Sequence, residues 1–150
     1  MTDFVLASLH HVLVFGLAGV LAAEIALIRP GLDGARLRRL GMVDAHYGAL
    51  AALIIAVGIL RVLYGVKGPT AYLPNPLFWA KMSAFLLVGL LSIAPTRQIL
   101  RWRRSARADP DFRTQASDVR RVRRWLLAQV AVFPFILIFA AAMARGMGLP

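Results

Sequence analysis

Residues 7–30, ASLHHVLVFGLAGVLAAEIALIRP, are the stretch that decides the fold. An apolar run of this length is enough for a helix that crosses a bilayer, which takes about 20 residues. The residues before it, MTDFVLA, lack the basic start of a secretory signal, and the run is longer than a signal core. We therefore expect a retained transmembrane helix, with His10 and His11 near one end and Glu24 near the other.

The whole chain combines apolar runs with a high positive charge. Of its 150 residues 59% are hydrophobic, and the net charge is +11, a pairing typical of integral membrane proteins. Four segments are long and apolar enough to be spans: 4–28, 45–64, 77–97 and 125–144. The sequence predicts one domain, residues 1–150, folded as an all-α four-helix up-down bundle. It contains no cysteine, which excludes disulfides and thiolate metal sites.

Arginines between the spans predict the orientation in the membrane. Four follow the first span and ten lie at or after the end of the third, namely Arg29, Arg36, Arg38 and Arg39, then Arg97, Arg101, Arg103, Arg104, Arg107, Arg113, Arg120, Arg121, Arg123 and Arg124. The opposite side has Lys67 and Arg145. The positive-inside rule then places both termini on the periplasmic side of a bacterial inner membrane. Trp102 and Trp125 flank the longer arginine-rich segment, which favours anionic lipid headgroups over nucleic acid as its partner.

Polar residues within the spans fall into two layers. The outer layer contains His10, His11, Arg61, Lys81 and Arg145, and the inner layer contains Glu24, Asp44, His46, Tyr47, Ser92 and Gln129. At 100° per residue, His10 and Glu24 differ by only about 40° around their helix. We therefore expect both to face the interior of the bundle, at two depths, while His11 points elsewhere.

Each of these residues also has an explanation that needs no ligand. Arg61 and Lys81 lie near helix ends, where long side chains reach the headgroups. Asp44 is placed to cap the second helix, and a histidine in a helix can bond a neighbouring carbonyl. Glu24 is harder to explain in this way, because its short side chain reaches the headgroups poorly. It is expected to be either neutral or paired with His46.

Taken together, the outer layer predicts a ligand site. Cations converge beside His10, and Asp3 is the one anion at that depth, which suits an anionic ligand that carries a metal. Haem b, with two propionates, is such a ligand, with His10 on the iron and Arg61 and Lys81 on the propionates. A phospholipid phosphate and a Cu(I) ion held by histidine and methionine are alternatives. The second axial ligand is left open between none, His11 from a second copy, Met82, Met143 and Lys81.

His46 does not qualify as that second ligand. It lies about 20 Å from His10 along the bundle, by helix rise, so one haem cannot bridge the two histidines.

Four motifs carry a resemblance to a known family: SLHHVLVFGLAGVLAAEIALIRPGL at 8–32, DAHYG at 44–48, FWAKMSAFLLVGLLSIAPT at 78–96 and AMARGMG at 142–148. Over nearly its whole length the chain resembles an uncharacterised family of four-helix bacterial inner-membrane proteins, a domain of unknown function. That family is distantly similar to the HemJ-type protoporphyrinogen IX oxidases and to CopD-like copper-resistance membrane proteins.

The HemJ-type likeness implies roles for two residues. In that type, a first-helix histidine after a leucine and a third-helix lysine near a tryptophan are the functional pair, and haem b is bound. Here Leu9 precedes His10, and Trp79 lies two residues before Lys81. The resemblance therefore implies that His10 and Lys81 are catalytic.

The leading hypothesis is a haem-b-binding inner-membrane redox protein that passes electrons to a membrane quinone, with Glu24, Asp44 and His46 as the candidate proton relay. One alternative is a non-enzymatic accessory subunit, in a larger membrane complex or a homo-oligomer. Small residues four apart, such as Gly48 and Ala52, would allow the close helix contacts that this alternative needs. Another is a small transporter that handles metal ions or protons.

Overall fold

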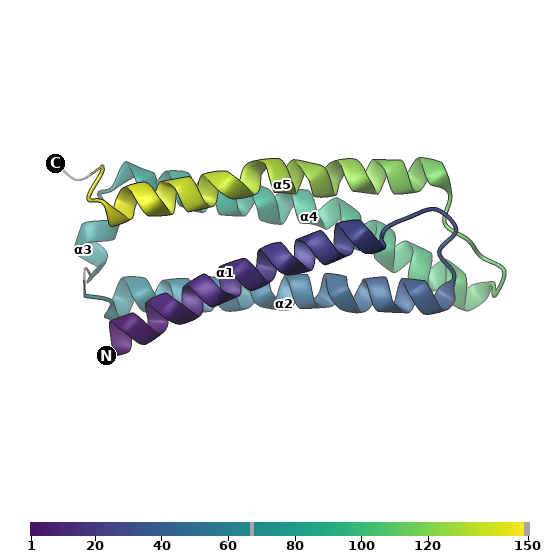
Figure 1. The fold of residues 1–150 in the computed structure, drawn as a ribbon, viewed down its shortest axis with the longest axis horizontal. Coiled ribbons are helices and arrows are strands. Elements are labelled where there is room, and N and C mark those ends of the chain that lie inside the picture. Colours follow the sequence, from purple (N-terminus) through teal and green to yellow (C-terminus); the bar gives the residue numbers. More distant parts are fainter. Residues whose placement is uncertain (67, 149–150) are drawn as a thin grey trace.

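The described residues form four long helices and one short helix. A computed structural model describes residues 1–66 and 68–148 of the chain, and Lys67 lies outside these residues. The helices are α1 (Thr2–Leu27), α2 (Gly34–Tyr64), α3 (Gly68–Tyr72), α4 (Pro76–Ala108) and α5 (Ala116–Ala144). The described part of the chain contains no strand, so the predicted all-α class is confirmed (Figure 1).

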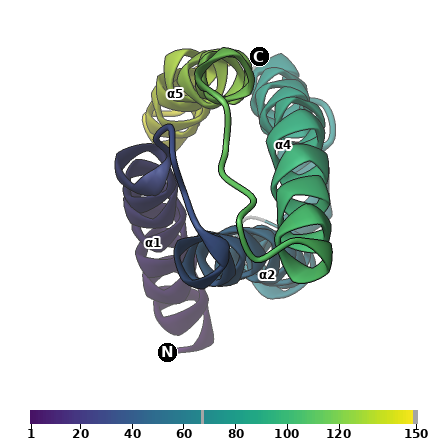
Figure 2. The ribbon, with the colours of Figure 1, turned by 90° about the vertical axis from the view of Figure 1, so that its right-hand side faces the viewer.

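The long helices run alternately up and down the bundle. Both termini and α3 lie at one end, and the connections from α1 to α2 and from α4 to α5 lie at the other (Figure 1). Seen along the bundle, α1 and α4 lie on opposite sides, each between α2 and α5 (Figure 2). Helix α1 packs mainly on α2, α4 packs mainly on α5, and α2 also contacts α4, whereas α1 and α5 meet over a short stretch.

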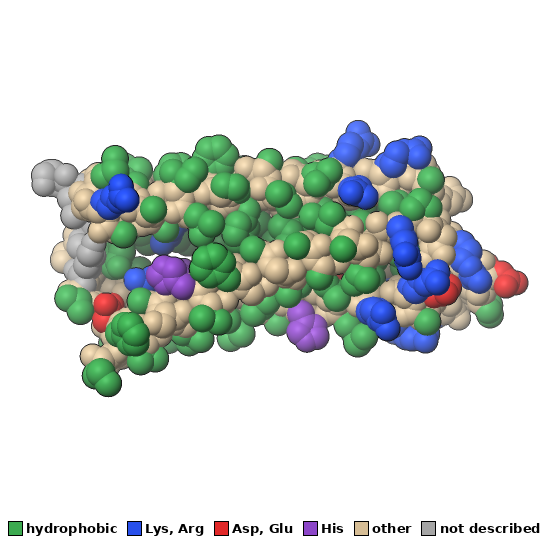
Figure 3. Space-filling view, in the orientation of Figure 1, with side chains coloured by type: hydrophobic (Ala, Val, Ile, Leu, Met, Phe, Trp, Pro, Cys, Tyr) green, Lys and Arg blue, Asp and Glu red, His purple; other side chains and the backbone are tan. Residues whose placement is uncertain are grey.

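The outside of the bundle is apolar along its length. Phe4, Phe15 and Leu86 are 73%, 68% and 62% exposed, and hydrophobic side chains run along the face shown in Figure 3. Continuous exposed apolar surface of this kind suits lipid rather than water. Because four helices are long and apolar enough to cross a membrane, the protein is a multi-pass membrane protein.

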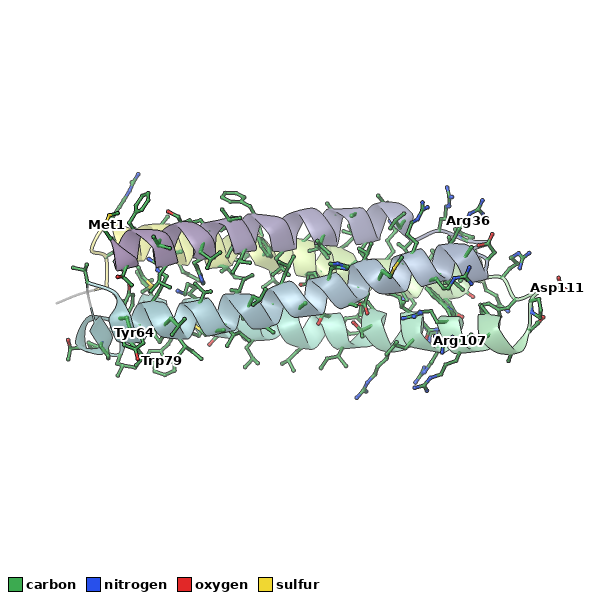
Figure 4. The ribbon with its side chains drawn as sticks, turned by 90° about the horizontal axis from the view of Figure 1, so that it is seen from below. Met1, Arg36, Tyr64, Trp79, Arg107 and Asp111 are labelled. Atoms are coloured by element: carbon green, nitrogen blue, oxygen red, sulfur yellow. The ribbon has the colours of Figure 1, made fainter. Side chains whose placement is uncertain are left out.

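The two ends of the bundle carry different side chains. Tyr64 and Trp79 lie at the end that holds Met1, and Arg36 and Arg107 lie at the opposite end (Figure 4). Both aromatic side chains are exposed, as is typical of residues at a membrane interface. The arginines therefore mark one end of the bundle and exposed aromatic residues mark the other.

Three helices extend beyond the predicted spans. Helix α2 begins at Gly34 rather than at 45, α4 ends at Ala108 rather than at 97, and α5 begins at Ala116 rather than at 125, whereas α1 differs from its predicted span by two residues or fewer. A helix of 33 residues, the length of α4, is about 50 Å long. It therefore extends beyond a hydrocarbon core of about 30 Å.

Buried apolar residues explain why the arginine-rich segments are helical. Leu37 and Leu40 in α2, Ile99 in α4 and Val122 in α5 are all buried, although arginines surround them in the sequence. Apolar residues at helical spacing give each extension one face that packs inward. Trp102 follows Ile99 by one turn on that face and is 3% exposed, so the expectation that it lies beside the headgroups is wrong.

Asp33, rather than Asp44, caps α2. The Asp33 side chain accepts a hydrogen bond from the Arg36 backbone N–H at 2.9 Å. This bond holds the pKa of the Asp33 carboxyl below its ordinary value. Asp44 lies well inside the helix and is buried. The alternative that Asp44 is a helix cap is therefore wrong.

Asn75 caps the N-terminus of α4. Its side-chain oxygen accepts a hydrogen bond from the Leu77 N–H at 2.9 Å, and Pro76 occupies the first turn, where no donor is needed. The Asn75 amide also donates to the Met147 carbonyl at 3.1 Å. One buried side chain thus caps α4 and ties it to the segment that follows α5.

Thr114 joins the two connections at the arginine-rich end. Its hydroxyl accepts a hydrogen bond from the Leu32 N–H at 2.9 Å and donates to the Arg29 carbonyl at 3.1 Å. Its carbonyl accepts from the Gly31 N–H at 2.9 Å, and Gly31 has a φ of 76°, which favours glycine. The connection between α1 and α2 is therefore held against the connection between α4 and α5.

Gly41 leaves room for an arginine inside the bundle. A Cβ atom at position 41 would lie 2.5 Å from Cδ and 2.9 Å from Nε of Arg103. The Arg103 Nε is buried and has no hydrogen-bond partner among the described residues. The absence of a side chain at Gly41 of α2 therefore leaves space for the side chain of Arg103 from α4.

We expect a cysteine in place of Asp111 to be labelled from the cytoplasm and a cysteine in place of Thr70 from the periplasm, because the arginine-rich end should face the cytoplasm. The sequence has no cysteine, so each variant reports one position. Labelling with a membrane-impermeant maleimide in intact cells and in inverted vesicles gives the comparison. The opposite labelling pattern would contradict the predicted orientation.

We expect Gly41→Ala to be less stable than Gly48→Ala. Both changes favour the helix by up to about 1 kcal/mol, and a Cβ at position 48 meets nothing within 4 Å. At position 41 the added methyl group must displace Arg103. Thermal unfolding of both variants in one detergent measures the difference. Equal midpoints would mean that the Arg103 side chain does not pack against Gly41 in solution.

Candidate functional site

Three residues of the predicted outer layer line one cavity. His10 from α1, Arg61 from α2 and Lys81 from α4 all contribute to a cavity of about 260 Å³. The remaining lining is mostly aliphatic and aromatic, and includes Phe85 and Phe133. The bundle therefore brings a histidine and two basic side chains from three helices to one apolar space.

His10 is the histidine that faces this cavity. Its Nδ1 atom is buried and has no hydrogen-bond partner among the described residues. The ring packs beside Gly58 on α2, where a Cβ atom would lie in ordinary van der Waals contact with Cε1 of His10, at 3.5 Å. A neutral imidazole nitrogen without a partner is available to a metal ion or a hydrogen-bond donor.

The other two histidines are bonded to their own helices and are exposed. The Nδ1 atom of His11 lies 2.6 Å from the Ala7 carbonyl oxygen, and that of His46 lies 2.7 Å from the Met42 carbonyl oxygen. His11 points away from the interior, as expected. His46 is on the outside of the bundle and is not brought together with Glu24, so the pairing of these two residues is not formed.

The two cations of the cavity lack carboxylate partners among the described residues. Arg61 Nε is buried without a hydrogen bond there, and Lys81 Nζ lies 5.6 Å from the centre of the Phe78 ring. The Asp3 carboxylate accepts a hydrogen bond from the Val66 N–H at 3.4 Å. Arg145 is exposed and lies outside the cavity. Two basic groups in an apolar cavity favour an anionic ligand.

The protein donors around His10 suit a metal that brings ligands of its own. Within residues 1–66 and 68–148, no group of three or more His, Asp and Glu residues is placed to hold a metal ion. Met82 lines the cavity beside His10, and Met143 does not. A bare Cu(I) ion would find few ligands here, whereas haem iron needs one or two side chains from the protein.

The inner polar residues form a separate cluster. Thr96 donates to Asp44 Oδ1 at 2.7 Å, and Tyr47 donates to Gln129 Oε1 at 2.9 Å. Glu24 is 2% exposed, and its Oε1 atom has no hydrogen-bond partner in the described part of the chain. Glu24 and Asp44 are close enough to interact electrostatically. The bundle thus buries two carboxyl groups together at the inner depth.

A second cavity lies along α2 and α4 and reaches the inner cluster. Its volume is about 770 Å³, and Asp44, Tyr47 and Thr96 line part of it. It shares four wall residues with the outer cavity, namely Leu17, Ile55, Met82 and Phe85. The Ser92 hydroxyl, which also lines it, donates to the Gly89 carbonyl at 2.7 Å.

The sequence alone does not predict that Arg103 and Thr96 belong to the inner layer. Arg103 is one of the arginines expected at the headgroups, and Thr96 lies at the end of the predicted span 77–97. Ile99 and Trp102 are apolar, lie three residues apart and are both buried. This spacing is the sequence signal that α4 continues past residue 97 with one face packed against the bundle. The Arg103 side chain also needs the space that Gly41 of α2 leaves, and the sequence of α4 does not show this contact.

The comparisons with known proteins agree with this architecture. A family model described as "Predicted membrane protein (DUF2214)" matches residues 2–148. No curated protein and no solved structure matches the chain. The family description names a membrane protein, in agreement with the four spanning helices and the apolar exterior. The chain belongs to this DUF2214 family of membrane proteins.

Proposed function

We propose that the protein binds haem b in the outer cavity and acts as a redox protein of the bacterial inner membrane. The observation that carries this proposal is the Nδ1 atom of His10, which has no hydrogen-bond partner in the described part of the chain and lies in an apolar cavity with Arg61 and Lys81. His10 would be a ligand of the iron. Arg61 and Lys81 would bind the propionates, as basic side chains bind carboxylates.

The side chains that line the outer cavity suit haem b by their chemistry. A porphyrin ring needs apolar and aromatic walls, and the cavity offers Phe78, Phe85 and Phe133. Its volume of about 260 Å³ is slightly below the range of roughly 300–1,000 Å³ typical of ligand sites. The larger neighbouring cavity has Met82 and Phe85 in common with it. Movement of these two side chains would join the cavities and enlarge the site.

Bound haem would supply one-electron chemistry, and the protein would supply the position and the surroundings. Both cavities lie between membrane-spanning helices. A lipid-soluble electron carrier such as a quinone is therefore the expected redox partner. The resemblance to the HemJ type supports a narrower proposal, oxidation of protoporphyrinogen IX, in which His10 and Lys81 are the functional pair.

We expect His10→Ala to reduce the haem content of the purified protein from stoichiometric to background, because the mutation removes the iron ligand. His46→Ala is the matched control, since its ring is exposed and bonded to its own helix. Absorption spectra and a pyridine haemochrome assay measure the haem after expression with ample haem supply. Full haem content in His10→Ala would refute the site, and colourless wild-type protein would instead support an accessory subunit.

We expect Lys81→Met to weaken haem retention by roughly ten- to a hundredfold, since a hydrogen bond to a charged group contributes about 1.5–3 kcal/mol. Methionine keeps most of the side-chain volume and removes the charge. Arg145→Gln is the control, because Arg145 is exposed and does not line the cavity. Transfer of haem to an apoprotein acceptor measures retention. Equal transfer rates for both variants would argue against propionate binding by Lys81.

A further inference from the structure

We infer that Glu24 is a proton-binding site built into the inner half of the bundle. It lies on α1, about four turns from His10 and about two turns from Leu17, which lines the cavity that contains His10. The inference rests on the surroundings of Glu24 and on the membrane location, and it does not depend on haem binding. Failure of one proposal therefore leaves the other to be judged by its own experiment.

Burial removes Glu24 from water and from lipid headgroups. Its side chain is 2% exposed, and Oε1 has no hydrogen-bond partner among the described residues. Leu21 and Ile28, on either side of it along α1, are also buried. A carboxyl group in this position has no access to solvent in the structure, so its charge must be compensated inside the protein or removed by a proton.

The groups that face Glu24 do not supply that compensation. From α2 come Asp44, which carries a like charge, and the hydroxyl of Tyr47. The Tyr47 hydroxyl already donates to Gln129 of α5, which is uncharged. Neither α2 nor α5, the two helices that pack against α1, therefore places a cation beside Glu24.

A nearby positive charge is found at the other carboxyl group, that of Asp44. Arg103 of α4 is within electrostatic range of Asp44, and the Thr96 hydroxyl donates to the same carboxylate at 2.7 Å. Asp44 thus has a donor and a nearby positive charge, and Glu24 has neither among the described residues. Of the two buried carboxyl groups, Glu24 is the one whose charge a proton has to remove.

A proton fits the site better than a metal ion does. Among the described residues, no group of three or more acidic or histidine side chains is placed to surround an ion here. A proton needs only one carboxyl oxygen. Asp44 and Tyr47, which face Glu24, line the cavity between α2 and α4. His46, which lies on the outside of α2, does not line this cavity.

The sequence provides a selective way to test this inference, because Glu24 is its only glutamate. Wild-type protein with ¹³C-labelled glutamate is placed in lipid nanodiscs, and the carboxyl signal is followed by infrared or solid-state NMR spectroscopy from acidic to alkaline pH. We expect the signal of a protonated acid at neutral pH, lost only at alkaline pH. Glu24→Gln identifies the signal by removing it.

Two results would overturn the inference. One is a carboxylate signal at neutral pH, which would mean that Glu24 is charged and has found a partner. The other is a signal that responds to sodium or potassium at constant pH, which would make the site a metal cation site. Because the measurement uses the wild-type chain, it does not depend on whether a variant folds.

Thermal unfolding gives an independent readout. We expect Glu24→Gln to unfold at the wild-type temperature at acid pH, where the carboxyl group is protonated in both the folded and the unfolded chain, because glutamine resembles the neutral acid. As the pH rises above about 4, where a free glutamate ionises, we expect the wild type to lose stability relative to Glu24→Gln. Asp111→Asn, which changes an exposed loop carboxylate, is the matched control and should keep the wild-type pH dependence. A large loss of stability in Glu24→Gln at neutral pH would indicate a charged, paired glutamate.

Discussion

The hydrocarbon interior of a bilayer offers no hydrogen-bond partners, and the rest of the structure depends on this constraint. The backbone within the hydrocarbon region must bond to itself, which makes each span a helix, and polar side chains there must turn toward one another. In this protein the exterior is apolar, and Tyr47, Gln129, Asp44 and Thr96 pair inside the bundle. Polar atoms that stay without partners inside such a bundle are therefore informative.

Those atoms lie at two depths and differ in charge. Toward the end that holds the termini, His10 and Arg61 each have a buried nitrogen without a partner in the described residues. Toward the arginine-rich end, the corresponding atoms belong to Glu24 and Arg103. Helix α1 contributes one residue to each depth, so this single helix connects a cationic cavity with a buried carboxyl pair. The first depth suits an anionic ligand and the second suits a proton.

At the arginine-rich end, the helices extend from the membrane into water and keep one buried face. Arginines alternate with buried residues such as Leu37, Ile99 and Trp102, so the helices continue beyond the lipid while one face still packs. Arg103 is an exception among these arginines because Gly41 admits its side chain to the interior. Thr114 holds the two connections together at this end, which fixes the helix ends near the inner carboxyl groups.

The sequence by itself determined that the chain forms four apolar helices, because span length and composition are local properties. It also placed His10 and Glu24 on one side of α1, since helical periodicity follows from spacing alone. Only the tertiary structure decided that Lys81 shares a cavity with His10, that His46 faces outward, and that Arg103 reaches the interior. These outcomes depend on how each helix is rotated against its neighbours, and that rotation is set by the packing of side chains from different helices.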